Sequence, residues 1–368
     1  MSPLATTPDP ALPPPARLTH MVQLDGLRAI AVSAVLFHHY SINYLSHAYG
    51  DAAGAGVKLF FVLSGFLITG ILLVARDQVE RGALNSRDAL RRFYVRRVLR
   101  IFPVYYGVVV VALIFQIGPA RDLVWWLLTY TLNLKMGAQG WYESTFAHFW
   151  SLNVEEQFYL FWPWVILFMP RRWLTRATIG MILVSPLGKL VYVLSDYSWG
   201  TNLETYISTW ASLDSLGIGA LIAVLRHRGA GITAPRSVAA TATAIIAAGP
   251  WLAVVFRHGV AEVILASTAQ AAVFGWVILR AADGFKGPVG ALLRSPPMVF
   301  VGRISYGIYV YHLFVPRTLV YFLYETAARR YSYGWRGAVA ATVGTLALAS
   351  LSWFLMEKPI NRLKDRFR

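Results

Sequence analysis

The feature that most constrains this chain is a succession of apolar runs, each long enough to cross a lipid bilayer. A shorter apolar stretch at 122–135 is expected to be re-entrant or interfacial. The pattern predicts an all-α, polytopic integral-membrane helical bundle of about ten transmembrane helices. The ten runs are found near 22–44, 57–75, 101–118, 148–169, 178–194, 209–225, 237–255, 260–281, 298–323 and 337–356.

The distribution of cationic residues predicts the orientation of the bundle. With ten spans and the N-terminus inside, the inner loops hold 21 Lys or Arg residues and the outer loops hold six. An eleventh span at 122–135 would place the later clusters of Lys and Arg on the outer side of the membrane, against the positive-inside rule. We therefore expect a multi-pass protein of the inner or plasma membrane with both termini in the cytoplasm.

Composition agrees with a membrane setting and excludes other classes of site. Charged residues make up 14% of the chain, against about 25% in a soluble domain. The net charge of +16 is concentrated in the short loops, so we expect lipid rather than nucleic acid as the partner of these cations. The chain has no cysteine, so it has no thiolate nucleophile and no zinc–thiolate site, and we expect no metal.

Three segments are expected from the sequence. Residues 1–20 are polar and rich in proline and lack the apolar core of a signal peptide, which predicts a disordered cytoplasmic tail. Residues 21–357 form the predicted transmembrane domain. Residues 358–368 form a basic cytoplasmic tail after the last span.

The first span carries ionisable residues at both of its ends. Asp25 and Arg28 come at its start, and His38 and His39 come at its end. Arg28 and His39 are eleven residues apart, so they share one helical face at about 16 Å along the axis, and His38 points roughly 80° away. Ionisable groups at membrane depth usually face an interior cavity. The alternative, that Arg28 snorkels to the headgroups and His39 is an ordinary buried histidine, stays open at this point.

Further spans contain unusual residues. In the second span Gly65 and Gly70 would let a neighbouring helix approach closely, and Lys58 near the outer end is expected to snorkel. Asp214 is a carboxylate at membrane depth beside two glycines. In the ninth span, Arg303 and His312 are nine residues apart on opposite faces, so they are not expected to share a site.

The most basic loop ends in a pair of arginines at the start of the third span. Arg97 and Arg100 are three residues apart and project side by side. Two guanidinium groups at that depth suit a bound phosphate. A topology signal with contacts to anionic lipid is the alternative, and it accounts for most of the other arginines of the loop.

A polar stripe opens the fourth span. His148, Ser151 and Glu155 are related by spacings of three and four residues and share one face. Glu155 is expected about 10 Å below the outer end of its span and His39 about 7 Å below the end of the first span, so the two side chains could meet. A carboxylate beside an imidazole would favour general-base chemistry. Simple hydrogen bonding between helices is the alternative.

Six stretches of the chain resemble the acyltransferase-3 family of integral-membrane acyltransferases. By this resemblance Arg28 and His39 fill the family's Arg-x10-His pattern, and Gly65, Phe66 and Leu67 its Gly-Phe-Leu-type motif. Arg97 and Arg100 fill its Arg-x-x-Arg pair, and Ser151 and Glu155 its Ser-x3-Glu pattern. The matching stretches are LDGLRAIAV, LFFVLSGFLITGILL, RRVLRIFPVYY, HFWSLNVEEQFYLFWP, VGRISYGIYVYH and MEKPI.

The resemblance implies transfer of a short acyl group, acetyl by default, from acyl-CoA as co-substrate, with no tightly bound cofactor. The implied acceptor is a hydroxyl of a carbohydrate or glycoside: a cell-surface polysaccharide, a glycolipid or a glycosylated metabolite. We hypothesise that Arg97 and Arg100 hold the CoA phosphates and that His39, oriented by Glu155, is the general base. In a variant of this mechanism, His39 itself accepts the acyl group to form an acyl-histidine intermediate. Arg28 or Ser151 would stabilise the oxyanion. Residues expected to support the site are Asp25, His148, Gly65, Phe66 and Asp214.

Two departures from the family's pattern affect this expectation. Lys58 stands where Asp, Gln or Ser is common in the family, which changes the chemistry of the outer mouth. The extracellular hydrolase-like domain of some members is expected to be absent, so a second transfer step would need a partner transferase on the outer face. The competing class is a transporter or flippase that uses Arg28, His39 and Glu155 as a proton or anion path. A non-catalytic membrane scaffold would leave these buried charges unexplained.

Overall fold

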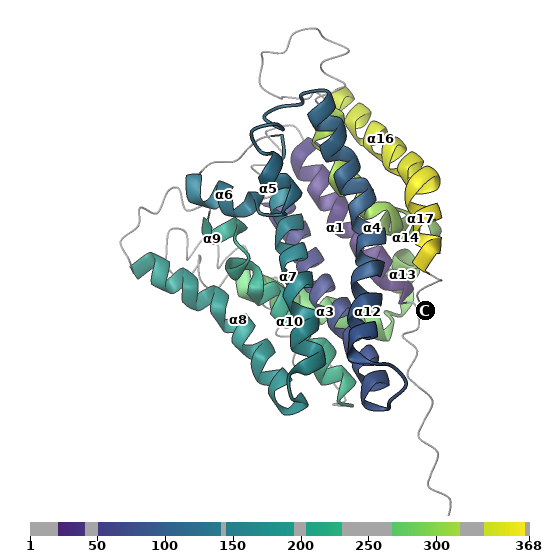
Figure 1. Cartoon of the computed structure of the whole chain (residues 1–368). Helices are drawn as coiled ribbons and strands as arrows, with labels where there is room; N and C mark the ends of the chain where they lie inside the picture. The colour runs from purple at the N-terminus through teal and green to yellow at the C-terminus, as the bar shows by residue number, and fades with distance from the viewer. Residues whose placement is uncertain are drawn as a thin grey trace, which may run out of the picture.

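The computed structural model describes residues 21–40, 51–140, 145–194, 204–229, 267–316 and 335–364, and these residues form an all-helical bundle (Figure 1). The helices are α1 (Val22–Tyr40), α3 (Ala52–Glu80), α4 (Ser86–Ile114), α5 (Val124–Leu128), α6 (Leu132–Gln139), α7 (Phe149–Phe168), α8 (Arg171–Leu194), α9 (Glu204–Ile207), the 3₁₀ turn η1 (Trp210–Ser212), α10 (Leu213–His227), α12 (Ser267–Asp283), α13 (Gly287–Leu293), α14 (Pro296–Tyr311), α16 (Trp335–Ser352), the π-helical turn η3 (Trp353–Glu357) and α17 (Lys358–Arg362).

Most predicted spans coincide with these helices, whereas the span 237–255 and the tail 1–20 fall outside the described residues. Among the described residues, the helices long and apolar enough to cross a membrane are Ala52–Glu80, Ser86–Ile114, Arg171–Tyr192 and Trp335–Arg362. The all-helical membrane fold is therefore confirmed, and the number of about ten spans stays a prediction. The stretch 122–135 forms the short helices α5 and α6, which are too short to cross a bilayer.

Side-chain caps fix where the two longest helices begin. The Asp51 carboxylate accepts a hydrogen bond from the Gly54 amide at 2.7 Å and starts α3. The Asn85 side chain accepts one from the Asp88 amide at 2.7 Å and starts α4. Each cap satisfies an amide that the first helical turn leaves without an intrahelical partner. The two helices form an antiparallel pair joined by the short connection 81–85.

The helices run alternately between two ends of the bundle that differ in chemistry. At the end that holds the α3–α4 connection, Arg171 of α8 pairs with Asp77 of α3, and His227 of α10 lies 3.2 Å from the same carboxylate. We call this the basic end. At the opposite end, the rings of His39, His148 and His312 gather from α1, α7 and α14. We call this the histidine end.

Glycines bring the central helices into close contact. A Cβ on Gly65 of α3 would lie 2.0 Å from the carbonyl oxygen of Leu216 in α10, and one on Gly219 would lie 2.1 Å from that of Val62. These reciprocal glycines confirm the predicted packing role of Gly65. The same prediction for Gly70 is wrong, because within the described part of the chain no neighbouring atom comes within 4 Å of the point that a Cβ on Gly70 would occupy.

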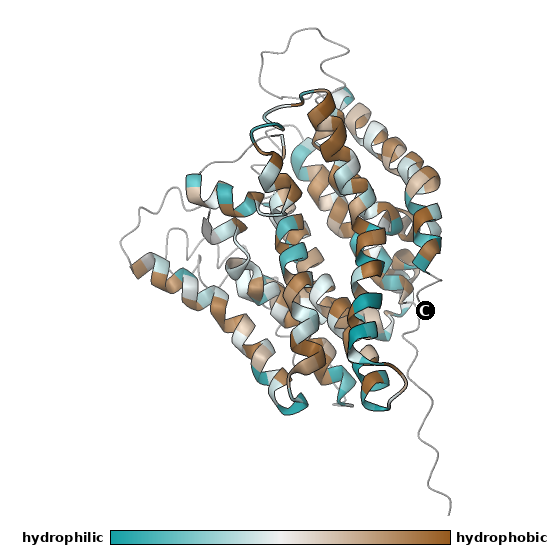
Figure 2. Ribbon diagram, viewed as in Figure 1, coloured by the Kyte–Doolittle hydropathy of each residue, from teal (hydrophilic) through white to brown (hydrophobic). Residues whose placement is uncertain are grey.

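Many large apolar side chains are exposed on the bundle. Figure 2 shows the hydrophobic stretches of the ribbon on α4, α7 and α8. A soluble domain rarely exposes so many large apolar side chains. Such a surface suits the hydrocarbon of a bilayer, which needs no polar cover. The exposed side chains include Val110, Val111, Ile114, Leu160, Phe161, Trp164, Leu183, Leu187, Val191, Val339, Val343, Leu351 and Leu355.

Candidate active site

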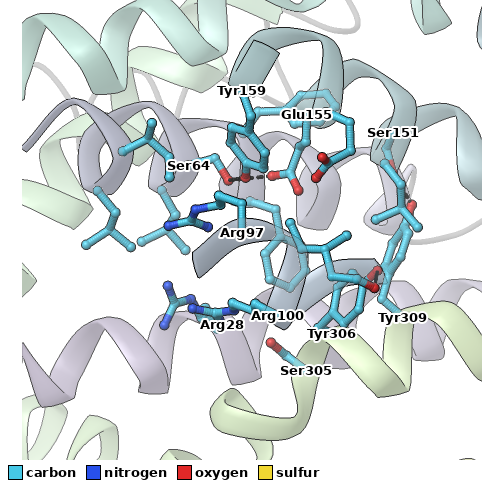
Figure 3. Close-up of a pocket in the computed structure, with 18 of the residues that line it drawn as sticks. Arg28, Ser64, Arg97, Arg100, Ser151, Glu155, Tyr159, Ser305, Tyr306 and Tyr309 are labelled. Carbon is cyan, nitrogen blue, oxygen red and sulfur yellow. Dashed lines mark hydrogen bonds between the residues drawn. The ribbon is translucent and has the colours of Figure 1, made fainter. Parts of the chain in front are cut away.

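A central cavity lies between α1, α3, α4, α7 and α14, and it encloses about 860 Å³ when its open mouth is included. The arginine side chains lie on one side of it, close to Ser64, and the hydroxyl groups of Ser151 and Tyr309 lie on the opposite side (Figure 3). The cavity therefore brings together residues from five helices that are far apart in sequence. Its polar lining consists of Arg28, Ser64, Arg97, Arg100, Ser151, Glu155, Glu156, Tyr159, Ser305, Tyr306 and Tyr309.

Two of the three arginines keep their hydrogen-bonding capacity for a ligand. Arg28 donates to the buried Asp25 carboxylate at 2.7 Å, one turn earlier in α1. Arg97 lies over the Tyr159 ring at 5.2 Å, and Arg100 is half-buried beside it. Within the described residues neither Arg97 nor Arg100 has a carboxylate within 4.0 Å. Guanidinium groups in this state are suited to a phosphate, which they can bind in a forked geometry.

A second cavity, the basic vestibule, adjoins the first towards the basic end and encloses about 1280 Å³ with its open mouth. Arg28, Arg97 and Arg100 line both cavities, so the arginines stand where the two meet. The vestibule adds two cations, Arg303 and Lys364, and two carboxylates, Asp25 and Glu357. Its side chains therefore include five cations and two acids, which favours an anionic ligand.

Lys364 lies beyond the last candidate span, at the rim of the vestibule. Burial, followed by repulsion from Arg100, Arg97 and Arg96, lowers the pKa of this lysine to about 7. The proximity of so many cations therefore makes the charge of the vestibule sensitive to pH near neutrality.

Glu155 belongs to a hydrogen-bonded chain inside the central cavity. The Ser64 hydroxyl donates to the Glu155 carboxylate, and the Tyr159 hydroxyl donates to Ser64 at 3.0 Å (Figure 3). Among the described residues, Glu155 and His39 make no contact with each other. The predicted pairing of these two side chains is therefore wrong: Glu155 faces α3 and the arginines, whereas the His39 ring packs against His312 at the histidine end.

A second hydroxyl pair stands at the side of the cavity away from the arginines. Ser151 of α7 and Tyr309 of α14 are joined by a hydrogen bond of 2.5 Å, and both side chains are buried (Figure 3). The Tyr309 hydroxyl lies 3.0 Å from the His148 carbonyl, to which it donates. The predicted stripe of His148, Ser151 and Glu155 thus faces two different surroundings, with Ser151 tied to α14 and Glu155 tied to α3.

The histidines lie beyond this hydroxyl pair. His312 is fully buried, and its ring centroid lies 5.0 Å from that of His39 and 4.8 Å from that of His148. The Nδ1 atom of His312 donates to the Tyr309 carbonyl at 2.6 Å, which leaves Nε2 as a buried nitrogen with no hydrogen-bond partner in the described structure. His39 itself is exposed at the last turn of α1 and does not line the central cavity.

Two further predicted residues, Phe66 and Asp214, do not line the central cavity. Phe66 is buried and lines the basic vestibule. Asp214 is fully buried on the far side of α3, where it accepts hydrogen bonds from Ser215, Ser267 and Thr268. Asp214 is therefore not part of the central cavity.

Sequence reasoning missed four residues of the site. Tyr309 and His312 lie one turn apart at the end of α14, where they separate the central cavity from His39. Ser64 and Tyr159 complete the hydrogen-bonded chain of Glu155. Tyr309 and His312 are three residues apart and therefore lie on one helical face. This spacing in the sequence could have predicted that the two side chains lie together.

Comparison with known proteins matches residues 21–355 to the family model described as acyltransferase domain. The peptidoglycan O-acetyltransferase OatA of Listeria monocytogenes is 26% identical over 93% of this chain and 56% of its own length. The O-acetyltransferase OatA of Staphylococcus aureus is 30% identical over 55% of this chain and 34% of its own length. The chain thus spans about half, or less, of these curated relatives. No solved structure matches it.

The family model covers nearly all of the helical domain, including the central cavity, most of the vestibule and the histidines. The chain therefore belongs to the acyltransferase-3 family.

Proposed function

We propose that this chain is a membrane O-acyltransferase that moves a short acyl group, acetyl by default, from acyl-CoA to a hydroxyl of a carbohydrate. The observation that carries the proposal is the pair of guanidinium groups, on Arg97 and Arg100, that line the junction of two cavities without a carboxylate partner among the described residues. The family membership supports the reaction class. The names of the relatives, a peptidoglycan O-acetyltransferase among them, support the acceptor class.

The basic vestibule is the proposed site of the CoA phosphates. Arg97 and Arg100 make forked contacts with the phosphate oxygens, and Arg303 and Lys364 add charge at the rim. Arg28 is held by Asp25, so its guanidinium is oriented before a ligand arrives. The pantetheine arm then extends through the central cavity, away from the arginines and towards Ser151 and Tyr309.

Transfer is proposed to occur at the Ser151–Tyr309 end. In this structure the hydrogen-bonded pair of hydroxyls lies between the central cavity and the histidines. This hydrogen bond therefore has to break before the acceptor hydroxyl, at His39, can reach the thioester in the cavity. His39 takes the proton of the acceptor hydroxyl while the hydroxyl oxygen attacks the thioester carbon. The new C–O bond forms, the C–S bond breaks, and CoA leaves as the thiolate. A freed hydroxyl of Ser151 or Tyr309 can donate to the developing oxyanion.

His312 replaces Glu155 as the residue proposed to position the base. Its ring packs against His39, and the donation from its Nδ1 fixes its tautomer, so that Nε2 is an acceptor. Glu155 instead accepts from Ser64, which accepts from Tyr159, and the Tyr159 ring lies against Arg97. The proposed role of Glu155 is to shape the path of the donor.

Comparative analysis of a deletion strain tests this function. Ester-linked acetyl groups are measured on cell-surface polysaccharides, glycolipids and glycosylated metabolites of the wild type, the deletion strain and complemented strains. We expect at least one acetylated carbohydrate to vanish in the deletion strain and to return with the wild-type chain, though not with His39→Ala. Unchanged acetylation of every carbohydrate fraction would contradict the proposal and favour the transporter or flippase.

A further inference from the structure

A second polar cluster, with two buried and two partly buried members, lies on a different face of α3 from the central cavity. It contains two lysines, Lys58 of α3 and Lys189 of α8, and one carboxylate, Asp214 at the start of α10. Gln270 of α12 completes it and accepts a hydrogen bond of 3.0 Å from the Lys58 ammonium. Lys58 thus points into the bundle and does not snorkel as the sequence predicted. The proposed mechanism uses none of these four residues.

The charges of this cluster do not balance. Lys189 is only 5% exposed, and it has no hydrogen bond and no carboxylate within 4.0 Å in the described part of the chain. Lys58 has Gln270 as its neutral partner and lies within electrostatic reach of both Lys189 and Asp214. A buried ammonium without a direct ion pair or hydrogen bond is costly, most of all at membrane depth. Asp214 is within electrostatic reach of both lysines, and Asp51 acts in addition on Lys58.

Asp214 does not resolve this imbalance, because neutral donors already satisfy it. One of its oxygens accepts from the amide and the hydroxyl of Ser215, at 2.6 and 3.1 Å. The other accepts from the hydroxyls of Ser267 and Thr268, at 3.1 and 2.9 Å. The carboxylate is thereby held in place, and within the described residues it forms no ion pair within 4.0 Å with either ammonium group. This arrangement leaves Lys189 available to bind an anion from outside the chain.

The cluster lies near the histidine end and shares a neighbour with His39. Asp51, the cap of α3, is within electrostatic reach of both His39 and Lys58. The Tyr206 hydroxyl donates to Asp51 at 2.8 Å and ties this point to α9. Lys58 comes seven residues after Asp51, about 10 Å along the helix axis. A ligand of the size of a sugar residue or two that reaches His39 would therefore also come close to Lys58.

We propose that Lys58 and Lys189 bind a carboxylate or phosphate group carried by the carbohydrate acceptor, so that the acceptor is an acidic sugar. The inference rests on the proposed function, because it assigns this anion to the acceptor of the same reaction. The shared chemistry is an oxyanion on a sugar ring. An ammonium is suited to it as a compact point charge with three donors.

Binding to the purified full-length chain tests this inference without any acyl transfer. Titration calorimetry compares methyl β-D-glucuronide and glucose 6-phosphate with the neutral methyl β-D-glucoside. We expect at least one of the two anionic probes to bind about tenfold or more tightly than the neutral probe, which corresponds to about one hydrogen bond to a charged group. The preference between the two anionic probes identifies the carboxylate or the phosphate as the recognised group.

Variants connect the preference to the cluster. Lys189→Met and Lys58→Gln should each remove most of the preference for the anionic probe. The matched control is Lys135→Gln, which removes a cation of α6 that lies 5.5 Å from the Trp126 ring, outside the cluster. That variant should keep the preference. Lys58→Gln retains a polar group beside Gln270, so it provides the decisive result if Lys189→Met does not fold.

Three outcomes would overturn the inference. The first is equal binding of the anionic and neutral probes by the wild type. The second is an anionic preference that persists in both lysine variants. The third is binding of inorganic sulfate as tight as that of the sugar anions, which would make the cluster a site for any small anion. Because the readout is binding, a chain that never cleaves acyl-CoA would contradict the proposed function and leave this test intact.

Discussion

Removing Arg100 should weaken the use of acyl-CoA selectively. Its guanidinium lines both the central cavity and the basic vestibule and lacks an ion-pair partner in the described structure, so its donors are available to the CoA phosphates. A hydrogen bond to a charged group is worth about 1.5–3 kcal/mol. Loss of that amount from Arg100→Ala corresponds to a rise of about 10- to 150-fold in the Michaelis constant for acetyl-CoA. The constant for the acceptor should change much less.

The chemistry of the side chain sharpens this prediction. Arg100→Lys keeps the positive charge but replaces the planar fork by a point charge, so it should restore only part of the affinity. Arg97→Ala should behave like Arg100→Ala, with an additional effect from the loss of its contact with the Tyr159 ring. Initial rates at varied acetyl-CoA, with the acceptor saturating, measure each constant.

Arg87 provides the matched control. It is exposed in the first turns of the same helix, α4, and lines neither cavity. If the arginines act only as a diffuse positive field, Arg87→Ala and Arg100→Ala should raise the Michaelis constant for acetyl-CoA equally, and both effects should fade at high salt. That result would refute the specific phosphate contact. We expect Arg87→Ala to be nearly silent and the effect of Arg100→Ala to persist in salt.

Three further predictions follow from the same geometry. His39→Ala should abolish acyl transfer while the protein still folds, and His38→Ala should keep appreciable activity. Equal loss of activity in the two variants at equal expression would contradict the inference that His39, which shares a helical face with Arg28, is the functional histidine. Gly65→Val should lower the free energy of unfolding by about 1–3 kcal/mol, because its side chain meets the backbone of α10, whereas Gly180→Val, with open space around it, should not shift the thermal midpoint in detergent. Lys364 is charged below its pKa of about 7, and a bound phosphate would raise that pKa, so acyl-CoA affinity should be greatest at low pH and fall as pH rises above 7. Lys364→Arg should flatten this dependence of the Michaelis constant, and a wild-type constant that does not change between pH 7 and 9 would contradict it.

The sequence was most informative where local helical geometry decides the outcome. Arg97 and Arg100 are neighbours on one helix, so their spacing alone placed them together at the cavity. Arg28 reached the same cavity because its position in the first span fixed its depth. The all-helical architecture followed from the lengths of the apolar runs, which need no knowledge of their neighbours.

Sequence reasoning failed where the rotation of one helix against another decides the outcome. The depths predicted for His39 and Glu155 were compatible, but the His39 ring lies against His312 near the start of α7, about two turns before Glu155. Spacing also does not say which face of α7 looks towards α1, and Glu155 faces Ser64 of α3. Tyr309 and His312 of α14 occupy the space between. For the same reason spacing could not tell that Gly65 contacts a helix while Gly70 lines the vestibule.

Cleavage of acetyl-CoA by the purified chain tests the central claim most directly. The assay follows release of free CoA thiol in detergent, with water or an added sugar as acceptor, for the wild type and for His39→Ala. We predict slow cleavage by the wild type and none by His39→Ala, although both bind CoA with similar affinity at the arginines. Acetyl-CoA that stays intact with the wild type, or cleavage that proceeds at full rate in His39→Ala, would contradict the assignment of this chain as an acyltransferase with His39 as its base.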